Sequence, residues 1–410
     1  MAWWDERSVL AAGPQQVAAR SLVAHVDLDC AYLREVVLHE FSRRPGWTVQ
    51  QPEGDASESV TSSDALFTWA EYERFDWKRV LAGHLHASAY CVRKGLIRKS
   101  NLAFSVKKWV SKHPESVLAT GVPETLLFEF WDSEYMDEAL ADVYEVRDMV
   151  DGRDWWILKP SMTNQARGIL VFNQLEQLKA ALCEEGAEDV REWVLQRYIH
   201  PPLLVGGRKF HLRVYALAVG ALRVYVFRDV LTLFSLAEYS DDPSNAAAHL
   251  TNTCRQAPAD AQEEAACVGL LSTLPDRLAA VGALPLEEAQ RRCATVFADA
   301  AALVGETFAA VSSELSFMPL DNAFELFGFD LLVDASWKVW LLEANAEPDF
   351  VQTGNALKRV VEGVVATTLQ ASIDTWFPEG KPTQPGAGKD PVLVFERADP
   401  RAQGAAMSFN

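Results

Sequence analysis

The chain has 410 residues, 49% of them hydrophobic, so it can bury a core divided among about two or three domains. Its formal net charge of −19 excludes general nucleic-acid binding, because a phosphate backbone is held by an excess of lysine and arginine. A secretory leader, a run of ~18 apolar residues and paired cysteine spacings are all missing, which indicates a soluble, reduced, intracellular protein without a membrane span or zinc site.

Residues 1–94 predict a small α/β domain. SLVAHVD has the apolar run of a buried strand, and WTVQQ predicts a second strand. Between them, YLREVVLHEFSRR has the spacing of an amphipathic helix with Val36, Val37 and Phe41 turned inward.

Residues 95–194 predict a central domain with helix LAFSVKKWV, strands WWILKP and GILVF, and helix LEQLKAALCEE. A basic run lies at its start, with seven lysines and arginines and no acid between Arg93 and Lys112. Such a run is either a solvated helix face or a surface that meets phosphates or an acidic peptide.

Lys159 ends the apolar strand WWILK and precedes a polar loop. A buried ammonium needs an anionic partner, since its desolvation otherwise costs several kcal/mol. A phosphate is one such partner; a lysine that snorkels from the strand end is the alternative.

Residues 195–378 predict a third domain that opens near WVLQRYI, whose backbone could meet an adenine edge as it links two domains. Two strands follow, KFHLRVYALAV and ALRVYVFRDVL, joined at Gly220–Ala221. Strand alternation places Lys209, His211 and Arg213 on one face, a basic stripe suited to an anion such as phosphate.

A long Ala-rich helical region is expected from Glu263 to about Ser313, and a closing helix from Ala356 to Ser372. Residues 379–410 predict a flexible tail that is rich in Pro and Gly at its start. Within it, PVLVFERAD is either a peripheral strand or disordered.

The stretch FELFGFDLLVDASWKVWLLEANAEPDF predicts a β-hairpin that turns at Ala335–Lys338. We expect Asp330 opposite Glu343, Leu332 opposite Leu341 and Asp334 opposite Val339. Two facing carboxylates repel, and the hairpin itself offers them no cation. A divalent ion such as Mg²⁺, with Asn345 as a third oxygen ligand, is therefore expected; hydrated acids at a solvent-facing hairpin end are the alternative.

Together these segments resemble the tubulin–tyrosine ligase-like family, whose members have the ATP-grasp fold. The resemblance covers about residues 99–348 and rests on RKSNL, ILKP, QRYI, KFHLR, HLTN and GFDLLVD…LLEAN. It implies an α/β (α+β) protein in which the central and C-terminal domains hold a nucleotide, preceded by a small α/β N-terminal domain.

The resemblance also implies ATP and Mg²⁺ as cofactors and a role for each site residue. It assigns the metal to Asp330, Glu343 and Asn345, transferred phosphate to Arg213, and substrate binding to Thr251 and Asn252. ATP is implied to contact Lys99, Lys159, Gln196, Arg197, Tyr198, Ile199, Lys209 and His211.

Two positions depart from the family pattern. The family aspartate of the Lys-Phe-Asp strand is His211, and the arginine expected after RDVL is replaced near Thr232–Leu233. KFHLRVY followed by VYVFRDVLTLF is similar to the fungal branch associated with mRNA-processing bodies.

The resemblance implies ATP-dependent amide formation on a peptide or protein acceptor, a tubulin tail being one option, through an acyl-phosphate. The first alternative is a ligation-deficient nucleotide-binding scaffold for the mRNA-decapping machinery, and the second is a ligase for a small metabolite. A cytoplasmic location is expected, with processing bodies for the fungal branch.

Overall fold

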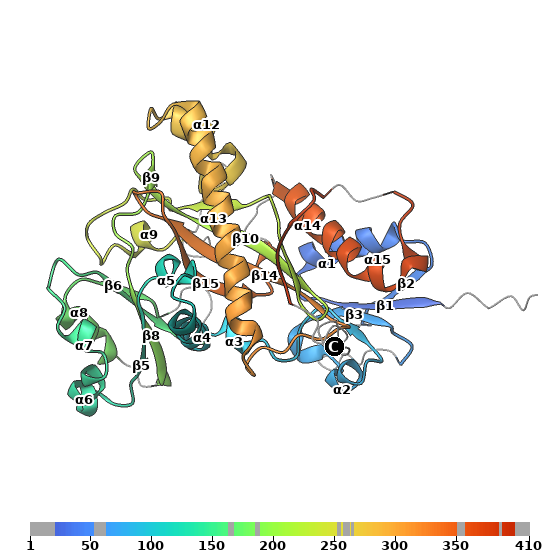
Figure 1. Cartoon of the computed structure of the whole chain (residues 1–410), viewed down its shortest axis with the longest axis horizontal. Helices are drawn as coiled ribbons and strands as arrows, with labels where there is room; N and C mark the ends of the chain where they lie inside the picture. The colour runs from blue at the N-terminus through green and yellow to red at the C-terminus, as the bar shows by residue number, and fades with distance from the viewer. Residues whose placement is uncertain are drawn as a thin grey trace, which may run out of the picture.

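The computed structural model describes residues 21–52, 63–162, 168–184, 189–251, 256, 263, 266–350, 357–384 and 388–397. Three β-sheets organise this described part (Figure 1). Helix α13 crosses the middle of the molecule, with the smaller antiparallel sheet on one side of it and the N-terminal sheet with α14 on the other.

The N-terminal sheet is parallel, with strand order β2-β1-β3-β4. The expected strand–helix–strand unit is confirmed: LVAHVD forms a wholly buried strand, and α1 buries Val36, Val37 and Phe41. The elements are β1 (Leu22–Asp27), α1 (Ala31–Ser42), β2 (Trp47–Gln50), β3 (Phe67–Ala70), η1 (Tyr72–Arg74), α2 (Trp77–Leu81) and β4 (His86–Ala87).

The small sheet is antiparallel, with order β5-β8-β6-β7, and its helices pack around Trp156 and Phe172. Three helices lead from the first sheet to it: α3 (Lys94–Ile97), α4 (Lys99–Lys112) and α5 (Leu118–Gly121). Its own elements are β5 (Thr125–Glu129), η2 (Ser133–Tyr135), α6 (Met136–Ala141), α7 (Tyr144–Arg147), β6 (Trp156–Pro160), β7 (Leu170–Phe172), α8 (Leu175–Leu182) and β8 (Glu192–Arg197).

The large sheet is built around β10, which pairs with β9, β11, β12 and β14. Its strands are β9 (Leu204–Val205), β10 (Arg208–Val219), β11 (Arg223–Val226), β12 (Leu231–Phe234), β13 (Val268–Leu270), β14 (Phe324–Val333), β15 (Val339–Ala346) and β16 (Val392–Glu396). The associated helices are α9 (Ala246–His249), η4 (Leu271–Thr273), α12 (Leu274–Ala280), α13 (Leu286–Ser312), α14 (Lys358–Ala371), α15 (Ile373–Trp376) and η7 (Pro378–Gly380).

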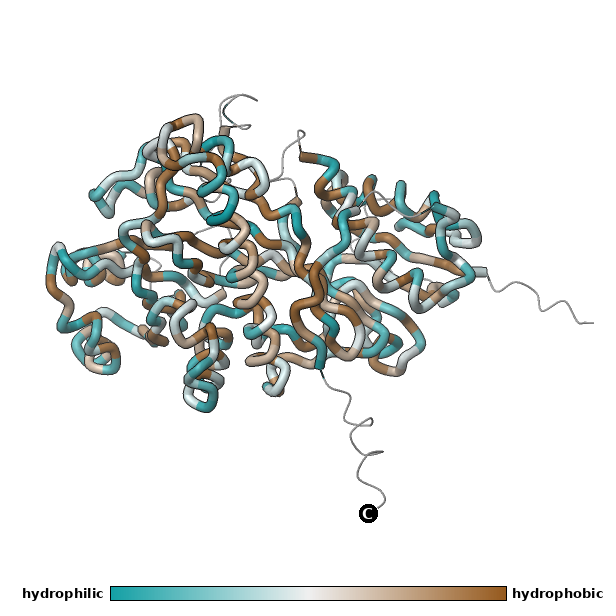
Figure 2. Tube along the Cα trace, turned by 45° about the horizontal axis from the view of Figure 1, so that its top comes forward, coloured by the Kyte–Doolittle hydropathy of each residue, from teal (hydrophilic) through white to brown (hydrophobic). Residues whose placement is uncertain are grey.

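Alternation along β10 decides what covers each face of the large sheet. Phe210, Leu212 and Val214 belong to the core shared with α13, whereas Tyr215 and Leu217 belong to the core shared with the N-terminal sheet and α14. In Figure 2 the hydrophobic colour is most continuous along strands in the middle of the molecule. The side chains before Tyr215 on its face, which are polar, therefore lie where the second core ends.

The expected hairpin forms from β14 and β15, and Asp330 does lie opposite Glu343. The expected pairs beyond it are wrong by one residue, because the register shifts between Asp330 and Leu331, which places Leu331 opposite Leu341 and Val333 opposite Val339. A bulge of this kind adds a residue to one strand and re-aims the side chains next to it.

Three other expectations can be compared with the observed elements. The boundary expected at residue 194/195 falls inside β8, which pairs with β5 and β6. The expected helical region contains strand β13 and two separate helices, α12 and α13. The tail segment from Val392 to Glu396 forms β16 on β11, which is the peripheral strand of the two alternatives. The domain boundaries stay predictions.

Helix α13 is long and apolar enough to span a membrane by length and composition, and it is the only such helix among the described residues. However, 56% of its apolar window is buried inside the protein. Its inward side chains pack on Phe327 and Phe329 of β14, as expected for a core helix.

Candidate functional site

The small and the large sheet together enclose a cavity of about 490 Å³. Every site residue named from the sequence lines it, except Asn252, which lies outside the described residues. The structure thus brings together side chains that are up to 246 positions apart, from 99 to 345, although their roles stay predictions. The lining includes Lys99, Lys159, Gln196, Arg197, Tyr198, Ile199, Lys209, His211, Arg213, Thr251, Asp330, Glu343 and Asn345.

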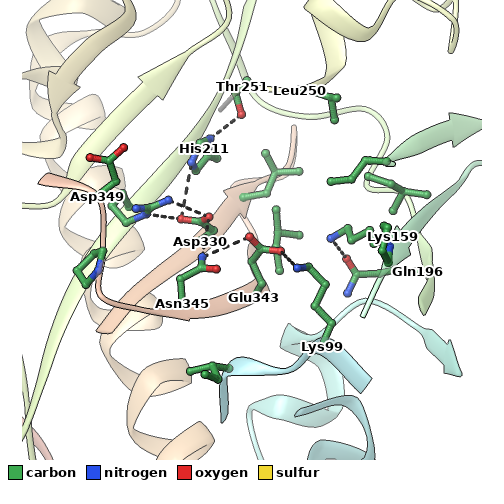
Figure 3. A pocket seen from close by; sticks show the side chains of 18 of the residues that line it. Lys99, Lys159, Gln196, His211, Leu250, Thr251, Asp330, Glu343, Asn345 and Asp349 are labelled. Atoms are coloured by element: carbon green, nitrogen blue, oxygen red, sulfur yellow. Dashed lines mark hydrogen bonds and ion pairs between the residues drawn. The ribbon is translucent and has the colours of Figure 1, made fainter. Parts of the chain in front are cut away.

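The hairpin carboxylates are compensated by cations from other elements (Figure 3). Arg213 of β10 donates from Nε to Asp330 Oδ1 at 2.5 Å and from Nη2 to Oδ2 at 3.2 Å. Lys99, the first residue of α4, lies with Nζ 3.4 Å from Glu343 Oε2. These contacts could not be predicted from the sequence, because both cations lie more than 100 residues from their carboxylates.

The Glu343 carboxylate and the Arg213 guanidinium both remain charged at neutral pH. Burial favours the neutral acid at Glu343, but the positive charges of Lys99 and Lys159 outweigh it and lower the pKa to about 2. Burial acts against the Arg213 guanidinium, but Asp330 outweighs it and raises the pKa of Arg213 above its ordinary value. The hairpin end is therefore a dense set of fixed charges at neutral pH.

Asp330, Glu343 and Asn345 also form a donor set that fits a hard divalent cation. The Asn345 amide lies against both acids, with Nδ2 3.4 Å from Asp330 Oδ2 and 3.3 Å from Glu343 Oε1. A half turn of the amide places its oxygen at the same spot. Two carboxylates and an amide oxygen are the ligands that Mg²⁺ and Mn²⁺ prefer.

Lys159 lies in the cavity wall as a buried cation. Its Nζ donates to Gln196 Oε1 at 2.9 Å, and no carboxylate of the described residues lies within ion-pair distance of it. Burial lowers the pKa of Lys159 to about 8. The anionic partner expected for this lysine is therefore not supplied by the described part of the chain.

Lys209 belongs to a network that was not expected from the sequence. Its Nζ donates to Tyr198 Oη at 2.7 Å and to the His249 carbonyl at 2.8 Å, and Tyr198 Oη lies 2.8 Å from His249 Nδ1. Burial, followed by the charge of Lys159, lowers the pKa of Lys209 to about 7. The signal was available in QRYI and HLTN, but nothing in their spacing showed that they meet.

His211 is 4% exposed and forms a hydrogen bond through only one of its ring nitrogens among the described residues. Nδ1 lies 2.5 Å from Thr251 Oγ1, whereas the buried Nε2 has no hydrogen-bond partner among the described residues. Nε2 lies 3.8 Å from Asp330 Oδ1. Burial lowers the pKa of His211 to about 4, which keeps the ring neutral near pH 7.

The family arginine is missing near Thr232 and Leu233, two adjacent residues of β12 whose side chains lie on opposite faces of the sheet. Leu233 pairs with His211 and shares its face, whereas Thr232 pairs with Leu212 on the other face. Of these two positions, Leu233 is the one on the same face as His211; both side chains are fully buried, and neither lines the cavity.

The basic run divides into two groups. Arg93 and Lys99 line the cavity, where Arg93 pairs with Glu347 at 2.9 Å and with the buried Glu325. Lys107, Lys108 and Lys112 are exposed on α4. The exposed lysines fit the solvated helix face, whereas contact of the run with phosphates or an acidic peptide stays a prediction.

The backbone after β8 has an open donor. Tyr198 N bonds to Trp155 O, whereas the amide of Ile199, which is 9% exposed, has no hydrogen-bond partner within the described ranges. A buried amide needs an acceptor. This edge of the cavity can therefore offer a donor to an acceptor group of a ligand.

Comparison with known proteins identifies the family. The profile of the Tubulin-tyrosine ligase family matches residues 84–383. A probable tubulin–tyrosine ligase of Schizosaccharomyces pombe is 33% identical over 358 residues, which are 77% of this chain and 85% of that protein. The probable tubulin–tyrosine ligase PBY1 of Saccharomyces cerevisiae is 29% identical over 364 residues, and the chain spans only 47% of its length.

A solved structure extends the comparison to the fold. The C-terminal domain of K. lactis Pby1, an ATP-grasp enzyme interacting with the mRNA decapping enzyme Dcp2, matches with a TM-score of 0.66 and 28% identity, over 92% of this chain and 100% of that one. The fold and the family expected from the sequence are confirmed. The chain belongs to the tubulin-tyrosine ligase family and has the ATP-grasp fold.

Proposed function

We propose that this protein binds Mg·ATP in the cavity between the two sheets and uses it to join a carboxylate to an amine. The observation that carries the proposal is that Lys99, Lys159 and Arg213 converge on one cavity beside the paired acids Asp330 and Glu343. Cations placed around facing carboxylates are what a metal-bound polyphosphate requires.

The base of the nucleotide would lie along residues 196–199. The Ile199 amide offers a donor to a ring nitrogen of adenine, and Tyr198 and Lys209 lie where a ribose would follow. Lys159 then supplies its charge to the phosphates, since it has no carboxylate partner among the described residues. Each contact satisfies a buried group, which favours binding.

Asp330, Glu343 and Asn345 would hold the magnesium ion, which when bound neutralises charge on the phosphates. Arg213 then stabilises the transferred phosphoryl group, and Lys99 and Lys159 keep the leaving ADP in place. The acceptor carboxylate oxygen attacks the γ-phosphorus, and the bond to the bridging oxygen breaks. The amine nitrogen next attacks the acyl carbon and forms the carbon–nitrogen bond. The bond from the acyl carbon to the phosphate oxygen breaks, inorganic phosphate leaves with that oxygen and the electron pair, and the nitrogen loses a proton.

The acceptor that we propose is a peptide or protein tail. Lys107, Lys108 and Lys112 are exposed on α4, the helix whose first residue reaches Glu343, so an acidic tail could be held beside the cavity. A tubulin tail is one option, since the relatives are described as probable tubulin–tyrosine ligases. A cytoplasmic location follows from this proposal.

A second candidate is a nucleotide-binding scaffold that has lost ligation. His211 replaces the family aspartate in the cavity wall, and the family arginine is missing near Thr232–Leu233, on the strand paired with His211. The K. lactis domain is described as interacting with Dcp2, so a decapping protein is the partner that this candidate predicts, with processing bodies as the location.

Binding and turnover can be tested separately. Calorimetry with Mg²⁺ and a nonhydrolysable ATP analogue tests the nucleotide site, and ADP release with candidate peptides tests ligation. Binding without peptide-dependent ADP release supports the scaffold, and both together support the ligase. No binding of the analogue to the folded chain would contradict both candidates.

A further inference from the structure

His211 has an unsatisfied nitrogen that faces the cavity wall beside the predicted metal ligands. The ring is buried, and Nδ1 is fixed by Thr251 Oγ1 at 2.5 Å. Nε2 has no hydrogen-bond partner among the described residues. A buried polar nitrogen left in this state costs free energy, so it favours any ligand that can engage it.

Among the described residues, no neighbour of Nε2 offers it a hydrogen bond. Lys209 donates to Tyr198 and the His249 carbonyl, and Arg213 donates to Asp330. The nearest acid atom, Asp330 Oδ1, lies 3.8 Å from Nε2, which is too long for a hydrogen bond. One cation can touch both atoms, because two coordination bonds of about 2.1 Å together span about 4.2 Å.

Thr251 holds the ring as an outer partner holds a metal-binding histidine. When Nδ1–H donates to the Thr251 oxygen, Nε2 keeps its lone pair and lies 3.8 Å from Asp330 Oδ1. The hydroxyl can accept as well as donate, so this tautomer costs nothing at Thr251. By contrast, His249 uses both ring nitrogens, on Tyr198 and on the Asp242 carbonyl.

We propose that His211 Nε2 is a further ligand of the divalent cation held by Asp330, Glu343 and Asn345, and that this mixed nitrogen–oxygen set favours Mn²⁺ or Co²⁺ over Mg²⁺. The proposal rests on the nucleotide–metal site proposed above. Imidazole is a poor ligand for Mg²⁺ and binds the later divalent ions more strongly. The departure from the family aspartate at His211 would then change the metal, which need not abolish nucleotide binding.

Pulsed EPR tests the bond directly. The full chain is loaded with Mn²⁺ and a nonhydrolysable ATP analogue, once with ordinary histidine and once with ¹⁵N-histidine. We expect nitrogen modulation of the Mn²⁺ signal that changes with the label. Unchanged spectra, with Mn²⁺ and analogue shown to be bound, would overturn the proposal but leave the proposed function intact. Failure of the analogue to bind with any metal would overturn both.

Two variants give an independent measurement. His211→Asn keeps a polar atom for Thr251 but lacks one at the Nε2 position, and we expect it to weaken Mn²⁺-supported analogue binding about tenfold more than Mg²⁺-supported binding. His211→Gln keeps an atom near Nε2 and should lose less. His113→Asn, at the end of α4 and outside the cavity lining, controls for the loss of a histidine. Equal losses with both metals would contradict the proposal.

Discussion

Arg213 and Asp330 are directly paired between β10 and β14 and share two hydrogen bonds, at 2.5 and 3.2 Å. Both side chains are about 6% exposed. The carboxylate predicted to bind the metal is thus already held by the cation predicted to meet the phosphate. Since a carboxylate oxygen has two lone pairs, a cation can bind there while Arg213 keeps one bond.

Removing one partner of the buried Arg213–Asp330 pair should destabilise the ligand-free protein much more than removing both. Arg213→Leu leaves Asp330 charged and buried, and we expect it to lower the free energy of unfolding by about 3–5 kcal/mol. Arg213→Leu with Asp330→Leu removes both charges and should recover much of that loss. Urea unfolding of the two single variants and the double variant measures the coupling. Additive losses would show that the pair does not act as a unit.

Glu343 should be required for metal-supported nucleotide binding. Glu343→Gln keeps the shape but removes the charge that faces Lys99, so Mg·ATP affinity should fall at least about tenfold, or about 1.4 kcal/mol. Glu314→Gln removes a similar surface partner of Lys108 and serves as the control. Calorimetry that gives the same Mg·ATP affinity for Glu343→Gln and the parent would place the metal elsewhere.

The two buried lysines should each contribute to phosphate or ribose binding. Lys159→Met and Lys209→Met keep an apolar stem and remove the charge, and we expect each to weaken ATP by about 1–3 kcal/mol, the range for charged hydrogen bonds. Lys108→Met on exposed α4 is the matched control. If both cavity variants bind ATP like the parent, the nucleotide does not lie between the two sheets.

Nucleotide affinity should fall as the pH rises through about 7 to 8, the pKa values of Lys209 and Lys159 in the free protein. Phosphates favour the charged ammonium, so binding raises both pKa values and takes up protons in this range. Calorimetry in buffers of different ionisation enthalpy measures the uptake, which should shrink in Lys209→Met. The absence of uptake between pH 7 and 9 would show that these lysines do not meet the phosphates.

The same lysines have an opposite effect on folding. Burial places both pKa values below 10.5, so the unfolded chain binds more protons above about pH 7. The free energy of unfolding contributed by these groups should therefore rise with pH from about 7 to about 10.5. A urea titration of the ligand-free protein across this range checks the sign.

The hairpin shows how far local sequence could predict the site. Alternation and the turn correctly placed Asp330 opposite Glu343, because those features are read within twenty residues. The shift at Leu331 was not predictable, because a bulge is decided by twist and packing against β10. The cations that balance the acids come from other elements, so only the folded chain shows Lys99 and Arg213 beside them.

The sheet to which a strand belongs was a second feature that could not be predicted from the sequence. WVLQRYI has the pattern of a strand, but its pattern does not say which neighbour it pairs with, and β8 joins the small sheet through β5 and β6. The Ala-rich region from 263 suggested helix by composition, yet VGL within it completes the edge of the large sheet as β13. In both cases tertiary pairing decided what local propensity could not.

The last prediction separates ligase from scaffold at His211 and Leu233. If these departures disable tyrosine ligation, the parent protein should bind ATP with a divalent ion yet add no tyrosine to detyrosinated α-tubulin at any substrate concentration. His211→Asp with Leu233→Arg places an acid and a base at paired positions of β10 and β12 and should recover some activity if the rest of the site is intact. Thr232→Arg is the contrasting variant, because Thr232 lies on the face opposite to His211, where an arginine is turned away from position 211 and should destabilise the protein by several kcal/mol without activity. Tyrosination by the parent protein would refute the scaffold candidate and show that His211 is compatible with catalysis.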